Sequence, residues 1–276
     1  MPVVVVTDSA ARLPDELIEQ YGIHVVPLHI LVGEHTFRDG VDPNPADLYQ
    51  VQASTSGASP TELAAAYAAA LAESGGAGVL AVHLSGALSA TVTSARYAAR
   101  QFDGAVQVLD SRSAAMGTGF VARVAAGAAR DGAPLAVVAA QASATVEHTH
   151  AFLVVQRLEN LRRSGRISAT ASWLGSALAL KPLLRISDGE LVLAQRVRTT
   201  SKATAAMIGQ VLDLVGEDRA DLAVHHVQSP AAAAELAATL TSALPGCGRP
   251  LVSELGPVLG VHLGTGALGV VIHLHV

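Results

Sequence analysis

The chain has 276 residues, a length at which two domains are the default expectation. Hydrophobic residues make up 50% of it but aromatic residues only 3%, so we expect an interior with aliphatic walls and little stacking surface. The scarcity of aromatic side chains and the formal net charge of −5 argue against a nucleic-acid partner.

The single cysteine, Cys247, excludes a disulfide framework within the chain and favours a reducing compartment. The N-terminus enters a strand pattern directly, without a basic segment or a small-residue cleavage site, so we expect no signal peptide. No apolar run approaches the roughly 20 residues that a membrane span needs. A cytoplasmic protein with at most transient membrane contact is expected.

Strand and helix patterns alternate through residues 1–150. The expected strands span residues 3–6, 23–32, 78–84 and 105–109, and the expected helices span residues 14–21, 59–73, 89–100, 114–129 and 135–145. Residues 33–54 are expected to form loops and a short helix. The alternation predicts a mainly parallel sheet with helices on both faces, in which a ligand binds at the carboxyl ends of the strands.

Residues 151–276 show a different pattern. The expected strands span residues 151–155, 182–186, 190–198, 221–227, 251–255 and 269–275, and the expected helices span residues 158–163, 172–180, 204–215 and 231–243. Ser187-Asp188-Gly189 between two of these strands is typical of a hairpin, which requires antiparallel pairing. The predicted fold is therefore α/β, with a parallel α/β/α domain at 1–150 and an α+β domain with a mixed or antiparallel sheet at 151–276.

The sequence contains partial motifs for nucleotide and metal binding, but the neighbouring residues that these sites require are missing. The Gly264–Gly269 loop spells G-x-G-x-x-G, but a strand-like tail of seven residues follows, so no helix can receive a pyrophosphate. The pairs His148/His150 and His225/His226 have no cysteine or carboxylate at ligand spacing. Neither a nucleophile elbow nor a Walker A sequence is present. The sequence predicts no catalytic residue, no metal site and no cofactor.

Hydroxyl side chains gather before two predicted helices. Thr55 and Ser56 precede the helix that Ser59 caps, and the segment Ser85–Thr91 follows a strand and opens the next helix. A helix N-terminus offers unpaired N–H groups and a partial positive charge, which suit an anion. Ordinary capping is the alternative for the same residues.

Two further polar residues lie in the second half. Arg166 follows Gly165, beyond the helix end whose dipole accounts for Arg162 and Arg163. His262 lies just before the glycine-rich loop, where the alternative is a solvent-facing histidine at the end of a strand.

These features fall into an ordered set of short segments that covers nearly the whole chain. The segments are Thr7-Asp8-Ser9 with Leu13-Pro14, Thr55-Ser56, Leu88-Ser89-Ala90-Thr91 with Ser94-Ala95, Asp110-Ser111, Leu158-Glu159-Asn160-Leu161, Gly165-Arg166-Ile167, Lys181-Pro182, Val197-Arg198-Thr199, His262 and the Gly264–Gly269 loop. In order and spacing they resemble the DegV family, the fatty-acid-binding proteins of bacteria. Three positions depart from the family pattern: Ala90 and Thr265 stand where glycine and proline are usual, and Gly57 where glutamine is common.

The resemblance implies a long-chain fatty acid buried between two domains. The residues that it places around the carboxylate are Thr55, Ser56, Ser89, Ala90, Arg166 and His262. It also implies a non-catalytic carrier that presents the carboxylate to the catalytic subunit of a fatty acid kinase, which would phosphorylate it to an acyl phosphate. A fatty acid needs a dry aliphatic pocket with a few polar groups at one end, which fits the composition.

Two other functions stay open. A kinase or transferase that acts alone on a small acid would need a phosphate-binding loop, and the sequence shows none. A regulatory module that senses a lipid would share the pocket and differ only in its partner.

Overall fold

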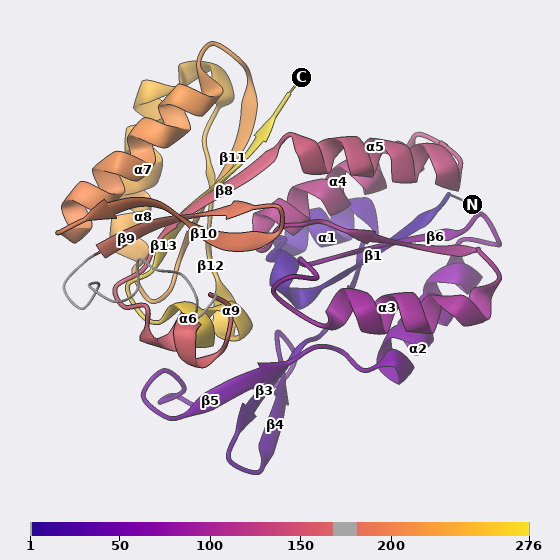
Figure 1. Cartoon of the computed structure of the whole chain (residues 1–276). Helices are drawn as coiled ribbons and strands as arrows, with labels where there is room; N and C mark the ends of the chain where they lie inside the picture. Colours follow the sequence, from indigo (N-terminus) through magenta and orange to yellow (C-terminus); the bar gives the residue numbers. More distant parts are fainter. Residues whose placement is uncertain (1, 168–180, 276) are drawn as a thin grey trace.

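The computed structural model describes residues 2–167 and 181–275 and arranges them in three β-sheets (Figure 1). The helix expected at 172–180 lies outside the described residues. In the part of the chain that the structure describes, no helix has both the length and the hydropathy to cross a bilayer.

The N-terminal sheet is parallel throughout, in the order β2-β1-β6-β7. Its strands are β1 (Val4–Asp8), β2 (His24–Val26), β6 (Val79–His83) and β7 (Val106–Asp110). Helices α1 (Asp15–Tyr21), α4 (Met116–Arg130) and α5 (Leu135–Glu147) pack on one face, and α2 (Pro60–Glu73) and α3 (Thr91–Ala99) on the other. All residues of β1 and β6 are buried, as expected for strands covered on both faces. The predicted parallel sheet is confirmed.

The C-terminal sheet has the order β10-β9-β8-β13-β11-β12 and is antiparallel except between β11 and β12. Its strands are β8 (Thr149–Val154), β9 (Lys181–Ser187), β10 (Glu190–Val197), β11 (Ala220–His226), β12 (Leu251–Glu254) and β13 (Leu268–Leu274). Helices α7 (Thr200–Val215) and α8 (Pro230–Ala243) cover one face. Asp188 and Gly189 have φ values of 52° and 82°, which suits a tight turn, so the predicted hairpin is confirmed.

The third sheet was not predicted. It is antiparallel, in the order β4-β3-β5, and consists of β3 (His29–Val32), β4 (His35–Arg38) and β5 (Ala53–Ser56). The expected strand at 23–32 is in fact two strands, β2 and β3, separated at Pro27, which has no N–H to donate to a ladder. The expectation of only loops and a short helix at 33–54 was wrong, since β4 and part of β5 lie there. Each of these strands has four partly or fully exposed residues and little apolar periodicity, so the sequence pattern did not indicate a strand.

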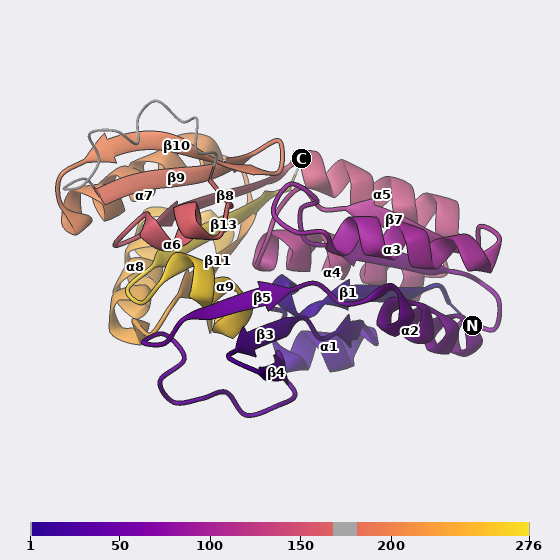
Figure 2. The same ribbon diagram turned by 60° about the horizontal axis from the view of Figure 1, so that its bottom comes forward.

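A helix in the C-terminal half was also missed. Helix α9 (Gly256–Leu263) follows β12 where only strands and a loop were expected, and His262 lies in its last turn rather than at the end of a strand. Helix α9 contacts β3 and β5, which belong to the N-terminal half (Figure 2). It also contacts the short helix α6 (Glu159–Arg163). Within residues 2–167 and 181–275, three short 3-10 helices complete the elements, at Ser9–Ala11, Arg100–Phe102 and Pro245–Cys247. The domain division near residue 150 stays a prediction.

Candidate functional site

A cavity of about 110 Å³ lies where the three sheets and α9 meet. Its wall is mainly aliphatic and includes Leu28, Leu84, Leu88, Phe152, Leu161, Ile186, Leu191, Leu255, Val258 and Leu259. These side chains come from both halves of the chain. A mainly apolar wall of this kind suits a hydrocarbon ligand.

Among the residues that the structure describes, few polar side chains line this wall. They are Thr55, Ser56, Ser89, Arg166, His225 and His262. The structure thus brings five of the six predicted site residues to one cavity. The sixth, Ala90, is exposed at the start of α3 and is not part of the wall. Whether any of them binds a ligand stays a prediction at this point.

Thr55 and His262 form the direct link between β5 and α9. A hydrogen bond of 2.7 Å joins Thr55 Oγ1 to His262 Nε2. The backbone places α9 close to its neighbours, since a Cβ at Gly260 would lie 2.6 Å from the Tyr49 hydroxyl oxygen. At the first residue of α9, Gly256 has a φ of 70° and a Cβ there would lie 2.5 Å from Arg12 Nη1. Glycine at these two positions lets α9 approach the N-terminal half.

His262 is a neutral imidazole at pH 7. Burial removes the hydration of the charged ring and Arg166 repels it, which together lower the pKa of His262 to about 4. Its Nδ1 is buried and has no hydrogen-bond partner within residues 2–167 and 181–275. One ring nitrogen at the cavity is therefore left to interact with something else.

Arg166 supplies a positive charge at the same end of the cavity. Its Nε donates to the carbonyl of Leu88 at 3.2 Å, and its Nη1 donates to the carbonyl of Ser164. Among the described residues it has no carboxylate partner. A guanidinium without a counter-ion beside an apolar cavity favours an anion.

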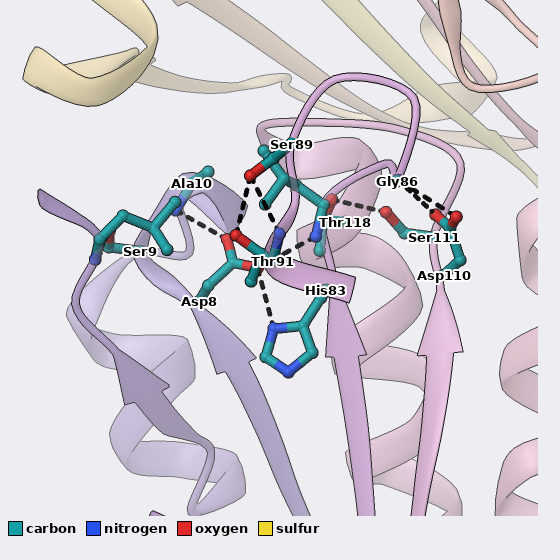
Figure 3. A network of polar contacts seen from close by, with 12 residues as sticks. Asp8, Ser9, Ala10, His83, Gly86, Ser89, Thr91, Asp110, Ser111 and Thr118 are labelled. Carbon is teal, nitrogen blue, oxygen red and sulfur yellow. Dashed lines mark hydrogen bonds and ion pairs between the residues drawn. The ribbon is translucent and has the colours of Figure 1, made fainter. Parts of the chain in front are cut away.

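Ser89 lies at the start of α3 but is not its N-cap residue, which is Ala90 and carries no side-chain cap hydrogen bond. Ser89 Oγ accepts from the N–H of Thr91 at 3.2 Å and also bonds to Thr91 Oγ1 at 2.8 Å (Figure 3). The end of β5 passes close to this turn, because a Cβ at Gly57 would lie 2.7 Å from Thr91 Oγ1. A larger residue at 57 would displace the Thr91 hydroxyl, so Gly57 is matched to its surroundings here.

Behind the cavity, a buried polar network ties β1 to β6. Asp8 accepts hydrogen bonds from the N–H groups of Ala10 and Leu84, at 3.1 and 3.0 Å, and lies 3.0 Å from His83 Nδ1 (Figure 3). The other ring nitrogen of His83 bonds to the Tyr67 hydroxyl at 2.8 Å. The network fixes the strand end that leads into the loop of Ser89.

A second polar cluster holds the next strand end, beyond β7. Asp110 accepts from the N–H of Gly86, and Ser111 Oγ bonds to Thr118 Oγ1 at 2.8 Å (Figure 3). Asp8, Asp110 and Ser111 at these strand ends thus hold loops in place and do not line the cavity.

His225 lines the cavity but was not predicted. Its Nε2 accepts from the N–H of Met116 at 3.2 Å, and its Nδ1 lies 3.1 Å from Ser253 Oγ. Burial, with a contribution from Arg12, lowers the pKa of His225 to about 3, so the ring is neutral. Both nitrogens are satisfied, which indicates a structural role, and the sequence held no signal beyond a histidine in a buried strand.

The β9–β10 hairpin connects the two halves at the far side of the cavity. Ser85 Oγ donates to the carbonyl of Gly189 at 2.8 Å, and Arg112 forms an ion pair with Asp188. Since Ile186 and Leu191 flank this turn and line the cavity, the hairpin helps to close it.

A family model described as "Uncharacterised protein, DegV family" matches residues 2–274. The chain belongs to the DegV family. A DegV domain-containing protein of Mycobacterium tuberculosis is 57% identical over 270 residues, covering 98% of this chain and 96% of the relative. The Protein DegV of Bacillus subtilis is 32% identical, covering 98% of each chain. The resemblance found in the sequence is thereby confirmed.

Solved DegV structures share the fold over the full chain. A DegV family protein from Thermus thermophilus, whose structure is titled for fatty acid binding, superposes with a TM-score of 0.93 at 31% identity and covers 100% of both chains. The structure of DegV from Bacillus subtilis, titled a fatty acid binding protein, gives 0.88 at 29% identity, again with 100% of both chains. The predicted two-part α/β architecture of DegV type is confirmed.

Proposed function

We propose that this protein binds one long-chain fatty acid, with the tail in the aliphatic cavity and the carboxylate beside Thr55, Arg166 and His262. The observation that carries the proposal is the polar end of that cavity. Two groups lie there beside apolar side chains. The guanidinium of Arg166 has no carboxylate partner among the described residues, and His262 Nδ1 has no hydrogen-bond partner among them. The fatty acids named for the related DegV structures support the same ligand class.

The energetics favour this ligand over a small acid. Each buried CH₂ contributes about 0.8 kcal/mol, so a 16-carbon tail gains on the order of 10 kcal/mol before ordering costs. The carboxylate must find partners, because an unpaired buried charge is very unfavourable. Arg166 supplies the opposite charge. Neutral His262 carries one ring proton, so either its Nδ1–H donates to the carboxylate while Thr55 donates to Nε2, or its Nε2–H donates to Thr55 Oγ1 and the Thr55 hydroxyl donates to the carboxylate. Ser56, Ser89 and the backbone N–H of Ala90 are further candidate donors at the rim.

Lipid analysis of purified protein tests the proposal. Protein prepared from cells should release about one fatty acid per chain on denaturation, identified by mass spectrometry. After delipidation it should bind palmitate or oleate with 1:1 stoichiometry. Protein that is reproducibly empty and binds neither acid would reject the proposal.

We further propose that the carboxylate is presented to the catalytic subunit of a fatty acid kinase. The supporting observation is charge: residues 157–202 contain nine basic and three acidic residues, although the whole chain carries −5. Arg166 belongs to this basic stretch, so the positive region includes the polar end of the cavity. An acidic face on a partner would be attracted to it.

Contacts bring parts of this basic stretch together. Lys181 Nζ donates to the carbonyl of Gln156 at 2.9 Å, and the Thr200 hydroxyl donates to Gln156 Oε1 at 3.2 Å. The end of β8, the start of β9 and the start of α7 therefore lie side by side. Exposed Arg198 and Lys202 flank this junction.

Charge reversal tests the partner. Arg198→Glu with Lys202→Glu should weaken binding of the lipid-loaded protein to a fatty acid kinase subunit by at least tenfold. Arg249→Glu, at an exposed arginine outside the basic stretch, is the matched control. Equal binding by both variants would contradict the partner surface, and phosphorylation of a small acid by this chain alone with Mg-ATP would favour the stand-alone kinase instead.

A further inference from the structure

A cluster of three metal-ligand side chains lies at the end of β13, outside the wall of the cavity. Asp221 on β11 pairs directly with His273 on the antiparallel neighbour β13. His275 follows two residues later, so His273 and His275 project from the same face of the strand. One potential ligand atom from each residue lies within 4.8 Å of the other two.

We propose that Asp221, His273 and His275 form a binding site for a divalent transition-metal ion, of which Zn²⁺ is the natural example. Asp221 Oδ2 lies 3.1 Å from His275 Nε2 and 3.6 Å from His273 Nδ1. Ligand atoms about 2.0–2.1 Å from a tetrahedral ion are about 3.3 Å apart, which falls between these two distances. The distances from Asp221 Oδ2 to the two imidazole nitrogens are therefore already close to those of a tetrahedral site.

The donor set selects the class of ion. Two imidazoles and one carboxylate suit zinc and its neighbours in the first transition series, and leave one position for water. Ca²⁺ and Mg²⁺ prefer sites made of oxygen ligands alone. An alkaline-earth site is therefore not expected here.

His273 Nδ1 gives independent support. The atom is buried and has no hydrogen-bond partner among residues 2–167 and 181–275, although it points toward the carboxylate. The ring lies 5.9 Å from that of Phe120 on α4, which limits its rotation. The side chains of Asp221 and His275 are 32% and 45% exposed, so an ion can reach the site from solvent.

Arg123 on α4 competes with the ion. Its Nη2 forms an ion pair with Asp221 Oδ2, the same oxygen that a metal would use. A guanidinium at that position repels a cation and occupies a lone pair of the carboxylate. The competition makes a sharp prediction, because removal of the Arg123 charge should tighten metal binding instead of weakening it.

The sequence did not indicate this site. The expectation of no metal rested on histidine pairs without a carboxylate nearby in the chain, whereas Asp221 reaches His273 only through strand pairing. The cluster takes no part in the proposed fatty-acid site, so the two proposals are tested separately.

Zinc titration of untagged, chelator-stripped protein at neutral pH tests the site, with affinity measured by competition against a chromophoric chelator. Wild-type protein should bind one Zn²⁺ per chain. Asp221→Asn and His275→Ala should each weaken binding at least tenfold, and Arg123→Gln should strengthen it several-fold. Substitution of Co²⁺ should give the visible absorption bands of a tetrahedral ion.

The controls address other possible zinc ligands. His35→Ala, at an exposed histidine on β4, and Cys247→Ser should both bind zinc as wild type does. His275 follows the last strand and contributes nothing to the buried core, so its replacement leaves the fold intact. Equal zinc affinity in wild type and His275→Ala, or a loss of binding in Cys247→Ser alone, would overturn the proposal.

Discussion

The polar side chains at the cavity and those just behind it are of similar types, but their hydrogen bonding differs. Behind the cavity, Asp8, His83 and Tyr67 are fully buried, and both ring nitrogens of His83 have hydrogen-bond partners, namely Asp8 and Tyr67. At the cavity, His262 keeps a buried Nδ1 with no partner among the described residues. Among the described residues, the acceptors of Arg166 are two carbonyl groups, those of Leu88 and Ser164.

The difference separates scaffold from site. A saturated buried network has no capacity left for a ligand, so its contribution is to the stability and the shape of the loops above it. Unused donors and charge beside an apolar cavity are unfavourable without a ligand, and a carboxylate would satisfy them. Substitutions in the first group should therefore cost stability, and substitutions in the second group should cost affinity.

The largest effect is expected from Asp8→Ala. It leaves His83 and the N–H groups of Ala10 and Leu84 without their acceptor, so the free energy of unfolding should fall by about 3–5 kcal/mol. Urea denaturation monitored by circular dichroism measures this. Tyr67→Phe, which removes a single hydroxyl from the same network, should cost only about 1–2 kcal/mol and serves if the first variant does not fold. An unchanged free energy of unfolding in both variants would contradict the assignment of this network to the scaffold.

The next effect is on affinity. Arg166→Met should weaken palmitate binding by about 10–100-fold, or roughly 1.5–3 kcal/mol, because the carboxylate loses its charged donor. The free energy of unfolding should change little. Arg162→Met, on the exposed part of α6, is the matched control and should bind as wild type does. Fluorescent fatty-acid displacement measures both, and equal affinity in the two variants would place the carboxylate elsewhere.

A smaller effect concerns pH. The folded pKa of His262 is about 4, below the ordinary 6.5, so between these values the unfolded chain binds a proton that the folded chain does not. The stabilising contribution is complete above pH 6.5 and is lost as the pH falls toward 4, and buried His225 acts in the same direction. His262→Gln should reduce the stability loss between pH 7 and 4.5 by roughly 1–2 kcal/mol.

Urea denaturation at the two pH values checks this expectation. His35→Gln replaces an exposed histidine and should follow the wild-type profile. A His262→Gln profile that coincides with wild type would mean that the ring is hydrated in solution, which would weaken the contrast between cavity and network.

The smallest effect is expected from Ala90→Gly, which restores the residue usual in the family. Ala90 is exposed, has a φ of −73° and is absent from the cavity wall, so glycine is not required there. Fatty-acid affinity should stay within twofold of wild type and the free energy of unfolding within about 0.5 kcal/mol. A large gain in affinity would show that the Ala90 methyl group obstructs the ligand.

Much of this protein follows from local sequence. The alternation of buried strands and helices predicted the parallel sheet, and Ser187-Asp188-Gly189 predicted the hairpin. Ser59 was expected to cap a helix, and in the structure it does so in a capping box with Glu62. These features depend on residues a few positions apart, where periodicity, turn conformation and capping act directly. Family motifs also named five residues that line one cavity.

Tertiary structure decided the rest. The β4-β3-β5 sheet, helix α9, the Thr55–His262 hydrogen bond and the Asp221–His273 pair join segments that no local pattern connects. Strand pairing and helix docking depend on which faces meet after the chain has folded. A short exposed strand such as β4 has too little apolar periodicity for its pairing to be predicted from the sequence. The sequence determined which side chains are available, and packing between the two halves determined which of them meet.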